Sequence, residues 1–170
     1  QIDRLRHSAT RSLFERRDSI IVASVSCIYG IGSPEFYSNM VMRLKVGDSM
    51  NRQKCLLRLV DLQYQRNDIS LTRNMFRVRG DTIDVFASHF EDRAWRINFF
   101  GDEIDEISEF DPLTGETYAQ LKEIALYPSS HYVTPQDRLH QALKQIKQDL
   151  AIRLEEFEKN NQLVEAQRLQ

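Results

Sequence analysis

The sequence predicts an α+β fold in which an antiparallel sheet is flanked by helices. Between residues 76 and 100, short segments alternate apolar and polar side chains and are separated by glycine turns, a pattern typical of antiparallel strands. Before residue 64 and after residue 134, apolar side chains recur at three- and four-residue intervals, which is the spacing of helices. Strands grouped together and bordered by helices indicate the α+β class.

The charge balance argues against a free-standing nucleic-acid binder. The 170 residues contain 23 Lys and Arg against 25 Asp and Glu, a formal net charge of −2. Because affinity for nucleic acid comes largely from neutralising phosphates, an independent binder usually carries a basic surplus. We therefore expect any DNA contact to be local.

Cysteine and histidine usage predicts a cytoplasmic protein without a metal site. Cys27 and Cys55 are too few and too isolated for a disulfide framework or a zinc site, and the four histidines show no ligand spacing. The longest apolar run, Ile20–Val25, is far short of the roughly 20 residues that span a bilayer.

The N-terminal part predicts a helix over Ile2–Arg17 and then a buried strand over Ser19–Tyr29. The second segment is β-branched and nearly continuous in apolar residues, as in strands buried on both faces of a parallel sheet. No other βαβ unit accompanies it, and the chain begins with Gln1 rather than Met. Both observations lead us to expect a piece of a longer protein that includes part of an α/β domain.

Two further helices are predicted before the sheet. The first runs from Ser33 to Leu44, because a capping residue is followed by proline. After a turn at Gly47, the second runs from a cap at Ser49 or Asn51 through Leu62.

The predicted strands cover Phe76–Arg79, Ile83–Phe86 and Trp95–Phe100, with a last short strand at Ile124–Tyr127. The segment Ile104–Phe110 is a further strand whose apolar residues are three apart, which predicts a β-bulge.

The C-terminal part predicts one long helix and a short continuation. Thr134-Pro135 provides a cap and a first-turn proline, and an apolar stripe from Leu139 to Phe157 is expected to pack in a core. Asn160-Asn161 interrupts the helix before Leu163–Leu169 resumes it.

A glycine turn, Gly30-x-Gly32-Ser33, follows the predicted buried strand and precedes a helix. Such a turn can bind a phosphate through backbone N–H groups. However, the full dinucleotide fingerprint and the Gly-Lys-Ser/Thr of a P-loop are both missing. A plain strand-to-helix connection is therefore favoured over a small enzyme with a phosphate ligand.

The arginines of the predicted sheet form the main candidate site. Arg77 and Arg79 are two residues apart on one strand and share a face, while Arg96 lies outward on another strand and Arg66 precedes the sheet. Guanidinium groups bind carboxylates bidentately, so such a face can dock a protein. The alternative is a solvated face with local ion pairs to nearby acids, namely Asp81, Asp84 and Glu103.

Two weaker features remain. Residues 102–111 contain six acids and no base, which is usually a solvated edge that discourages strand pairing. Ser24 and Ser26 share one face of the predicted buried strand, a weak indication of contact with a ligand.

Seven short motifs in order and spacing resemble the UvrB family of bacterial excision-repair proteins. They cover nearly the whole chain, and seven in register are highly specific. The motifs are residues 6–10 (RHSAT), 22–30 (VASVSCIYG), 32–35 (GSPE), 63–68 (QYQRND), 76–81 (FRVRGD), 99–104 (FFGDEI) and 130–134 (SHYVT).

The resemblance implies three parts: the end of the first helicase-like domain segment (1–38), the UvrA-interaction domain (39–133) and the start of the following domain-1 segment (134–170). It also implies a parent that uses ATP and Mg²⁺, probes damaged DNA and recruits the incision nuclease UvrC. The family's P-loop and later helicase motifs lie outside this chain. We therefore expect no cofactor and no catalytic activity here, and UvrA as the partner.

The resemblance also implies roles for individual residues. Positions matching the family's UvrA contacts are Arg66, Arg77, Arg79, Arg96 and Asn98, the last standing where the family usually has Glu. Positions resembling its DNA path are Arg6, Ser24, Ser26, Tyr29 and Tyr132. The nearest alternative is the related UvrA-binding module of a transcription-repair coupling factor, which shares the arginine-bearing sheet but matches residues 29–35 less well.

Overall fold

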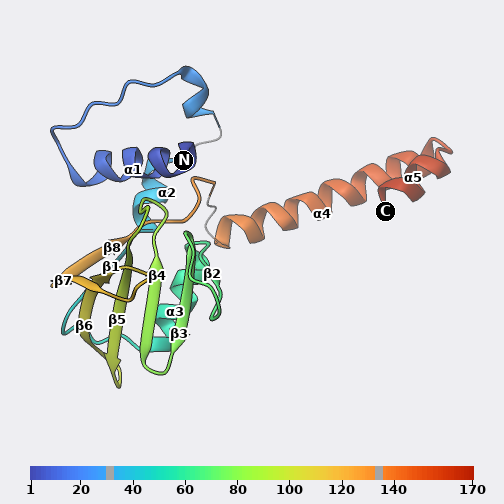
Figure 1. Cartoon of the computed structure of the whole chain (residues 1–170). Coiled ribbons are helices and arrows are strands. Elements are labelled where there is room, and N and C mark those ends of the chain that lie inside the picture. Colours follow the sequence, from blue (N-terminus) through green and yellow to red (C-terminus); the bar gives the residue numbers. More distant parts are fainter. Residues whose placement is uncertain (30–32, 133–135) are drawn as a thin grey trace. The chain divides into compact units, whose positions relative to one another are not determined.

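The computed structural model describes residues 1–29, 33–132 and 136–170 (Figure 1). The chain divides into two compact units, Gln1–Val133 and Thr134–Gln170. No helix within these described ranges is both long enough and apolar enough to cross a membrane.

The first unit is built around a six-stranded sheet with the strand order β2-β3-β4-β5-β6-β7. All neighbouring strands are antiparallel except β2 and β3, which are parallel. The predicted α+β class is therefore confirmed. The strands are β2 (Gln65–Arg66), β3 (Met75–Arg79), β4 (Thr82–Phe86), β5 (Ala94–Phe100), β6 (Glu103–Phe110) and β7 (Thr117–Leu121).

A second, two-stranded sheet pairs β1 (Met42–Lys45) with β8 (Glu123–Leu126) in antiparallel register. The helix predicted through Leu44 is wrong beyond Asn39, because α2 spans only Pro34–Asn39. In β1 the side chains alternate between buried Met42 and Leu44 and exposed basic residues. This alternation suits a strand whose one face is covered, and β8 supplies the backbone partner.

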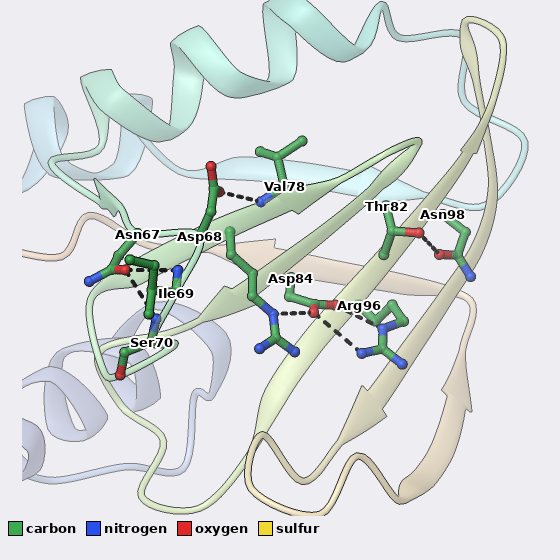
Figure 2. A network of polar contacts seen from close by, with 10 residues as sticks. Asn67, Asp68, Ile69, Ser70, Val78, Thr82, Asp84, Arg96 and Asn98 are labelled. Carbon is green, nitrogen blue, oxygen red and sulfur yellow. Dashed lines mark hydrogen bonds and ion pairs between the residues drawn. The ribbon is translucent and has the colours of Figure 1, made fainter.

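One face of the large sheet is covered by α3 (Arg52–Asp61), as Figure 2 shows. The predicted cap is confirmed, since the Asn51 side chain accepts a hydrogen bond of 2.9 Å from the backbone N–H of Gln53. Cys55 and Leu59 on this helix are fully buried in one cluster with apolar residues of the strands. Burial raises the pKa of the Cys55 thiol to about 12, so it remains protonated in this core.

The predicted bulge is confirmed in β6. Asn98 of β5 lies opposite Glu106, whereas Phe99 lies opposite Ile104, so Asp105 is an additional residue in the ladder. At the turn between β3 and β4, Gly80 has a φ of +60°, a conformation that glycine adopts without a steric cost.

The buried strand predicted over Ser19–Tyr29 is wrong. Its last part forms the 3₁₀ helix η1 (Val25–Ile28), and no described strand pairs with the residues before it. Ile20 and Val22 are 91% and 95% exposed. A β-branched run becomes a buried strand only where neighbouring strands satisfy its backbone, and none does so within the described ranges. The preceding helix is confirmed as α1 (Ile2–Glu15).

The second unit is a helical hairpin. Here α4 (Gln136–Lys159) and α5 (Leu163–Leu169) meet at Asn161, which has a φ of +60°, so the predicted interruption is confirmed. The predicted core packing of the whole stripe is wrong, because Leu139 and Ile146 are 50% and 60% exposed. The short α5 can cover only the last turns of α4. The predicted cap at Thr134-Pro135 lies outside the described residues.

Candidate functional site

The face of the large sheet that α3 does not cover carries three rows of side chains. Strand alternation and the pairing register place the members of each row side by side on β3, β4, β5 and β6. The first row is apolar and includes Met75, Phe86, Ala94 and Phe110; the second is Arg77, Asp84, Arg96 and Ser108; the third is Arg79, Thr82, Asn98 and Glu106.

Asp84 joins two arginines at the centre of this face. Its Oδ2 accepts a hydrogen bond of 2.8 Å from Nε of Arg77, and its Oδ1 accepts one of 2.8 Å from Nε of Arg96. Nη2 of Arg96 adds a bond of 3.3 Å to Oδ2 (Figure 2). The side chain of Asp84 is 3% exposed, against 12% for Arg77 and 30% for Arg96. One carboxylate therefore fixes two cations, and the group keeps a net charge of +1.

Arg96 is also fixed from a second direction. Its guanidinium carbon lies 4.2 Å from the ring centroid of Phe110, which is fully buried in the apolar row. A guanidinium over an aromatic face is attracted by the negative charge of that face. The stacking and the bond to Asp84 together leave this side chain little rotational freedom.

The edge of the face is organised differently. Arg66 of β2 forms a two-pronged salt bridge with Asp68, with bonds between 2.9 and 3.3 Å, and both side chains are about half exposed. The Arg66 bonds lower the pKa of the Asp68 carboxyl group, and so does a bond that this group accepts from the backbone N–H of Val78 (Figure 2). Arg79 is exposed at the end of β3.

Asn98 is engaged within the third row. Thr82 Oγ1 donates a hydrogen bond of 2.9 Å to its Oδ1, and its Nδ2 donates one of 3.1 Å to Oε2 of Glu106. Gln120 of β7 donates a further bond to Glu106. Asn98 therefore acts as a neutral hydrogen-bonding residue inside the sheet.

These contacts bear on both interpretations of the arginines. Asp84 is the local carboxylate that the solvated-face alternative requires. Neither Asp81 nor Glu103 forms a salt bridge with the arginines in the described part of the chain. Yet the two arginines use mainly Nε for Asp84, and within the described ranges no hydrogen bond engages the Nη atoms of Arg77 or Nη1 of Arg96. Asp84 therefore holds the guanidinium groups and leaves some of their N–H donors without a hydrogen bond within the described residues.

The residues expected along a DNA path lie on different local elements, and the path itself stays a prediction. Ser24 and Ser26 hydrogen-bond to each other at 2.7 Å between their Oγ atoms, but the strand that was to align them is not formed. Tyr29 and Tyr132 are 70% and 63% exposed. Arg6 lies on α1. Gly30 and Gly32, for which a plain connection was favoured over a phosphate site, lie outside the described residues.

Sequence reasoning missed a buried histidine pair. His7 of α1 stacks on His131 with ring centroids 4.1 Å apart, and Thr10 Oγ1 lies 2.9 Å from Nε2 of His131. Burial and the neighbouring His131 lower the pKa of His7 to about 4. The two histidines are far apart in the chain, and although each lies in one of the seven motifs, no local spacing indicated that they pair.

Asp3, His7 and His131 place potential ligand atoms within 4.8 Å of one another. The ring planes are inclined by only 22°. The lone pair of an imidazole nitrogen lies in the plane of its ring, so two rings can bind one ion only where their planes meet. Planes so nearly parallel meet much farther from the rings than a metal–nitrogen bond of about 2.1 Å, so the two histidines cannot both bind one ion. The pair is arranged for packing.

A sheet with one face packed on a helix and the other lined by anchored arginines defines the class of the first unit: an α+β domain with a polar sheet face. Residues 42–132 match the family model of the UvrB interaction domain, and the chain belongs to this family. Residues 137–170 match a second model, the UvrB third helical domain. The resemblance stated from the seven motifs is confirmed.

Relatives give the same family. The chain is 54% identical over 170 residues to UvrABC system protein B of Symbiobacterium thermophilum, covering 100% of this chain and 26% of the relative. It is 53% identical over 169 residues to the protein of the same name in Carboxydothermus hydrogenoformans, covering 99% and 26%. The protein of that name in Oleidesulfovibrio alaskensis is 52% identical over 169 residues, covering 99% and 25%. The chain thus spans about a quarter of the length of these relatives.

Proposed function

We propose that this chain docks UvrA through the polar face of its large sheet. The observation that carries the proposal is the anchored pair Arg77 and Arg96, which share the buried carboxylate of Asp84 and have further Nη atoms that form no hydrogen bond within the described residues. The family model's description as an interaction domain and the name UvrABC system protein B support UvrA as the partner.

The chemistry of the face favours a partner that presents carboxylates. The Nη atoms of an arginine donate in a fixed planar fork, which matches the two oxygens of Asp or Glu. Arg79 and Asn98 of the neighbouring row extend the surface with a further cation and a neutral amide. The first, apolar row lies on the other side of the arginines and is an uncharged border of the polar face.

In the whole protein, this chain would serve as the docking part of an ATP-dependent subunit of the UvrABC excision nuclease. That subunit would bind ATP with Mg²⁺, probe damaged DNA and recruit UvrC. The P-loop expected for the family does not occur in this sequence, so we propose that the chain by itself hydrolyses no ATP.

Capture of the whole chain by purified UvrA, measured by surface plasmon resonance, tests the proposal. Replacing Arg77 and Arg79 with alanine should reduce affinity by at least about 30-fold, since truncating a buried interfacial charge typically costs on the order of 2–5 kcal/mol. Arg153→Ala, on the helical hairpin, is the matched control and should bind normally. Circular dichroism and thermal melts would establish that each variant folds. Unchanged capture by the double variant would refute the docking face.

The exposure of Tyr29 and Tyr132 favours a second contact, with DNA, in the whole protein. Exposed aromatic rings can stack on unpaired bases. In a gel-shift assay at moderate salt we expect the isolated chain to bind DNA weakly, because its net charge is −2. Replacing both tyrosines with leucine should reduce whatever binding is seen. Strong binding that survives both changes would contradict this path.

A further inference from the structure

We infer that Asp84 is a positioning residue for docking: it holds Arg77 and Arg96 in the geometry that a partner's carboxylates recognise. The inference rests on the proposed docking function and goes one step beyond it. It assigns a role in binding an acidic surface to a residue that is itself acidic and out of the partner's reach.

The location of Asp84 supports this role. It lies in the middle of β4, between Ile83 and Val85, which are both fully buried. On the opposite side of the strand, its carboxylate sits between Arg77 of β3 and Arg96 of β5, which are its direct neighbours in the register. A group that is 3% exposed and flanked by two cations is not available for a contact outside the chain.

The hydrogen-bond pattern shows what Asp84 fixes. Each of its oxygens accepts an Nε–H bond of 2.8 Å, one from each arginine. A bond at Nε fixes the orientation of the guanidinium plane. One or both Nη atoms then remain without a hydrogen bond to Asp84. An arginine held in this way has lost much of its side-chain entropy before the partner arrives, so less is lost on docking.

A simpler account makes the opposite prediction. If the face attracted an acidic partner only through its net positive charge, Asp84 would weaken docking, and neutralising it would strengthen docking. If Asp84 prepares the geometry, neutralising it should weaken docking although the face becomes more positive. The sign of a single measurement therefore separates the two accounts.

Asp84→Asn is the decisive variant, because asparagine keeps the size of the side chain and removes its charge. Binding of the whole chain to purified UvrA would be followed by surface plasmon resonance. We expect faster dissociation and affinity reduced by about 10-fold, with association unchanged or up to about threefold faster from the added positive charge. Affinity that is unchanged or higher would overturn the positioning role.

A double-mutant cycle separates positioning from a general loss of structure. In the Arg77→Ala background, Asp84→Asn should cost clearly less affinity than it does alone, because one of the groups it positions is already gone. In the Arg79→Ala background the cost should be unchanged, since within the described residues Arg79 forms no hydrogen bond or salt bridge with Asp84. Equal costs in both backgrounds would also overturn the inference.

If Asp84→Asn fails to fold, Arg96→Lys still tests the geometry. Lysine keeps the charge but lacks the planar fork and the Nε donor. We expect its affinity to fall by about 10-fold, and wild-type affinity would overturn the inference. The proposed function can fail separately: normal capture by the Arg77→Ala and Arg79→Ala double variant removes the docking face itself. Loss of capture there, with normal capture by Asp84→Asn and Arg96→Lys, removes only the positioning role.

Discussion

The centre and the edge of the polar sheet face hold their arginines in different ways. At the centre, Arg77 and Arg96 are 12% and 30% exposed and share one buried carboxylate. At the edge, Arg66 is 53% exposed and pairs with Asp68, which is itself 44% exposed. The arginines of this sheet are therefore not equivalent, and in the docking that we propose, the anchoring and burial of each arginine should determine its contribution to affinity.

Different exposure to solvent explains why the arginines at the centre and at the edge should contribute differently to affinity. An exposed ion pair such as Arg66 with Asp68 contributes on the order of 0–1 kcal/mol, because water and salt screen it and both side chains lose rotational freedom. A partly buried arginine that is already fixed has lost most of that freedom on folding. Residues at the buried centre of an interface usually dominate its affinity, while those at the rim mainly affect the rate of association.

The largest expected effect tests this contrast directly. Arg96→Ala should reduce affinity for UvrA by about 30- to 100-fold, whereas Arg66→Ala should reduce it by about threefold or less. Surface plasmon resonance on both variants, side by side, measures the ratio. Both should fold, because Arg77 still pairs with Asp84 in the first variant. Equal losses would break the distinction between centre and edge.

The sheet and α1 should also differ in how their stability depends on pH, because α1 carries His7 of the buried histidine pair. The folded pKa of His7 is about 4, below its ordinary value of 6.5, because burial and the facing His131 and Arg6 disfavour the charged form, which outweighs the attraction of Asp3. The neutral form is therefore favoured by folding. Neutral His7 makes its whole contribution to the free energy of unfolding above pH 6.5, and this contribution is lost as the pH falls towards 4.

Between pH 7 and pH 5, the free energy that holds α1 in place should fall by about 2 kcal/mol. Hydrogen exchange, corrected for the intrinsic pH dependence, measures this as lost protection in Ile2–Glu15, with Ala94–Phe100 of β5 as the internal control. A His7→Phe variant should lose its pH sensitivity in α1. Protection that falls equally in α1 and β5 would show that the two regions do not differ.

The sheet was largely predictable from the sequence, and the predictions that failed depended on distant partners. β3, β4 and β5 follow from local alternation of apolar and polar residues. The nearly continuous β-branched run at Ser19–Tyr29 is also a strand signal, yet it forms no strand because no described strand lies beside it. β1 alternates apolar and basic residues but is only four residues long, and its pairing with β8 is a tertiary contact that no local pattern reveals.

In the candidate site, too, local features were predictable from the sequence, whereas contacts between distant residues were not. Alternation placed Arg77 and Arg79 on one face, but the shared role of Asp84 depends on the register of three strands. A shift of one residue in either pairing would turn this carboxylate away from an arginine. Asp84 was recognised beforehand only as an acid available for local pairing, because its burial and its two partners are tertiary properties.

A smaller effect should come from the ring beneath Arg96. Phe110→Leu keeps an apolar side chain in the row but removes the aromatic face, which lies 4.2 Å from the guanidinium carbon. Loss of a partly exposed cation–π contact should reduce affinity by about two- to fivefold, corresponding to roughly 0.5–1 kcal/mol. Calorimetric titration with UvrA would resolve this change. An unchanged affinity would show that Asp84 alone fixes Arg96.

The smallest expected effect concerns Asn98, at a position where the family resemblance leads us to expect Glu. Its Nδ2 donates to Glu106, so Asn98→Glu would place two carboxylates opposite each other on neighbouring strands. Like charges at such a pair should destabilise the domain by about 0.5 kcal/mol, which urea denaturation can measure. Asn98→Gln is the control, because it keeps an amide donor and adds no charge.

The same variant shows whether the partner supplies a cation at this position. If UvrA presents a basic residue here, Asn98→Glu should bind UvrA about threefold more tightly at low salt, and the gain should disappear as ionic strength rises. If the contact is a neutral hydrogen bond, affinity should fall slightly at every salt concentration. The internal bonds of Asn98 to Thr82 and Glu106 favour the second result. A salt-sensitive gain would instead show that the row of Asn98 also binds the partner through charge. The third row would then belong with Arg77 and Arg96 to the centre of the docking face.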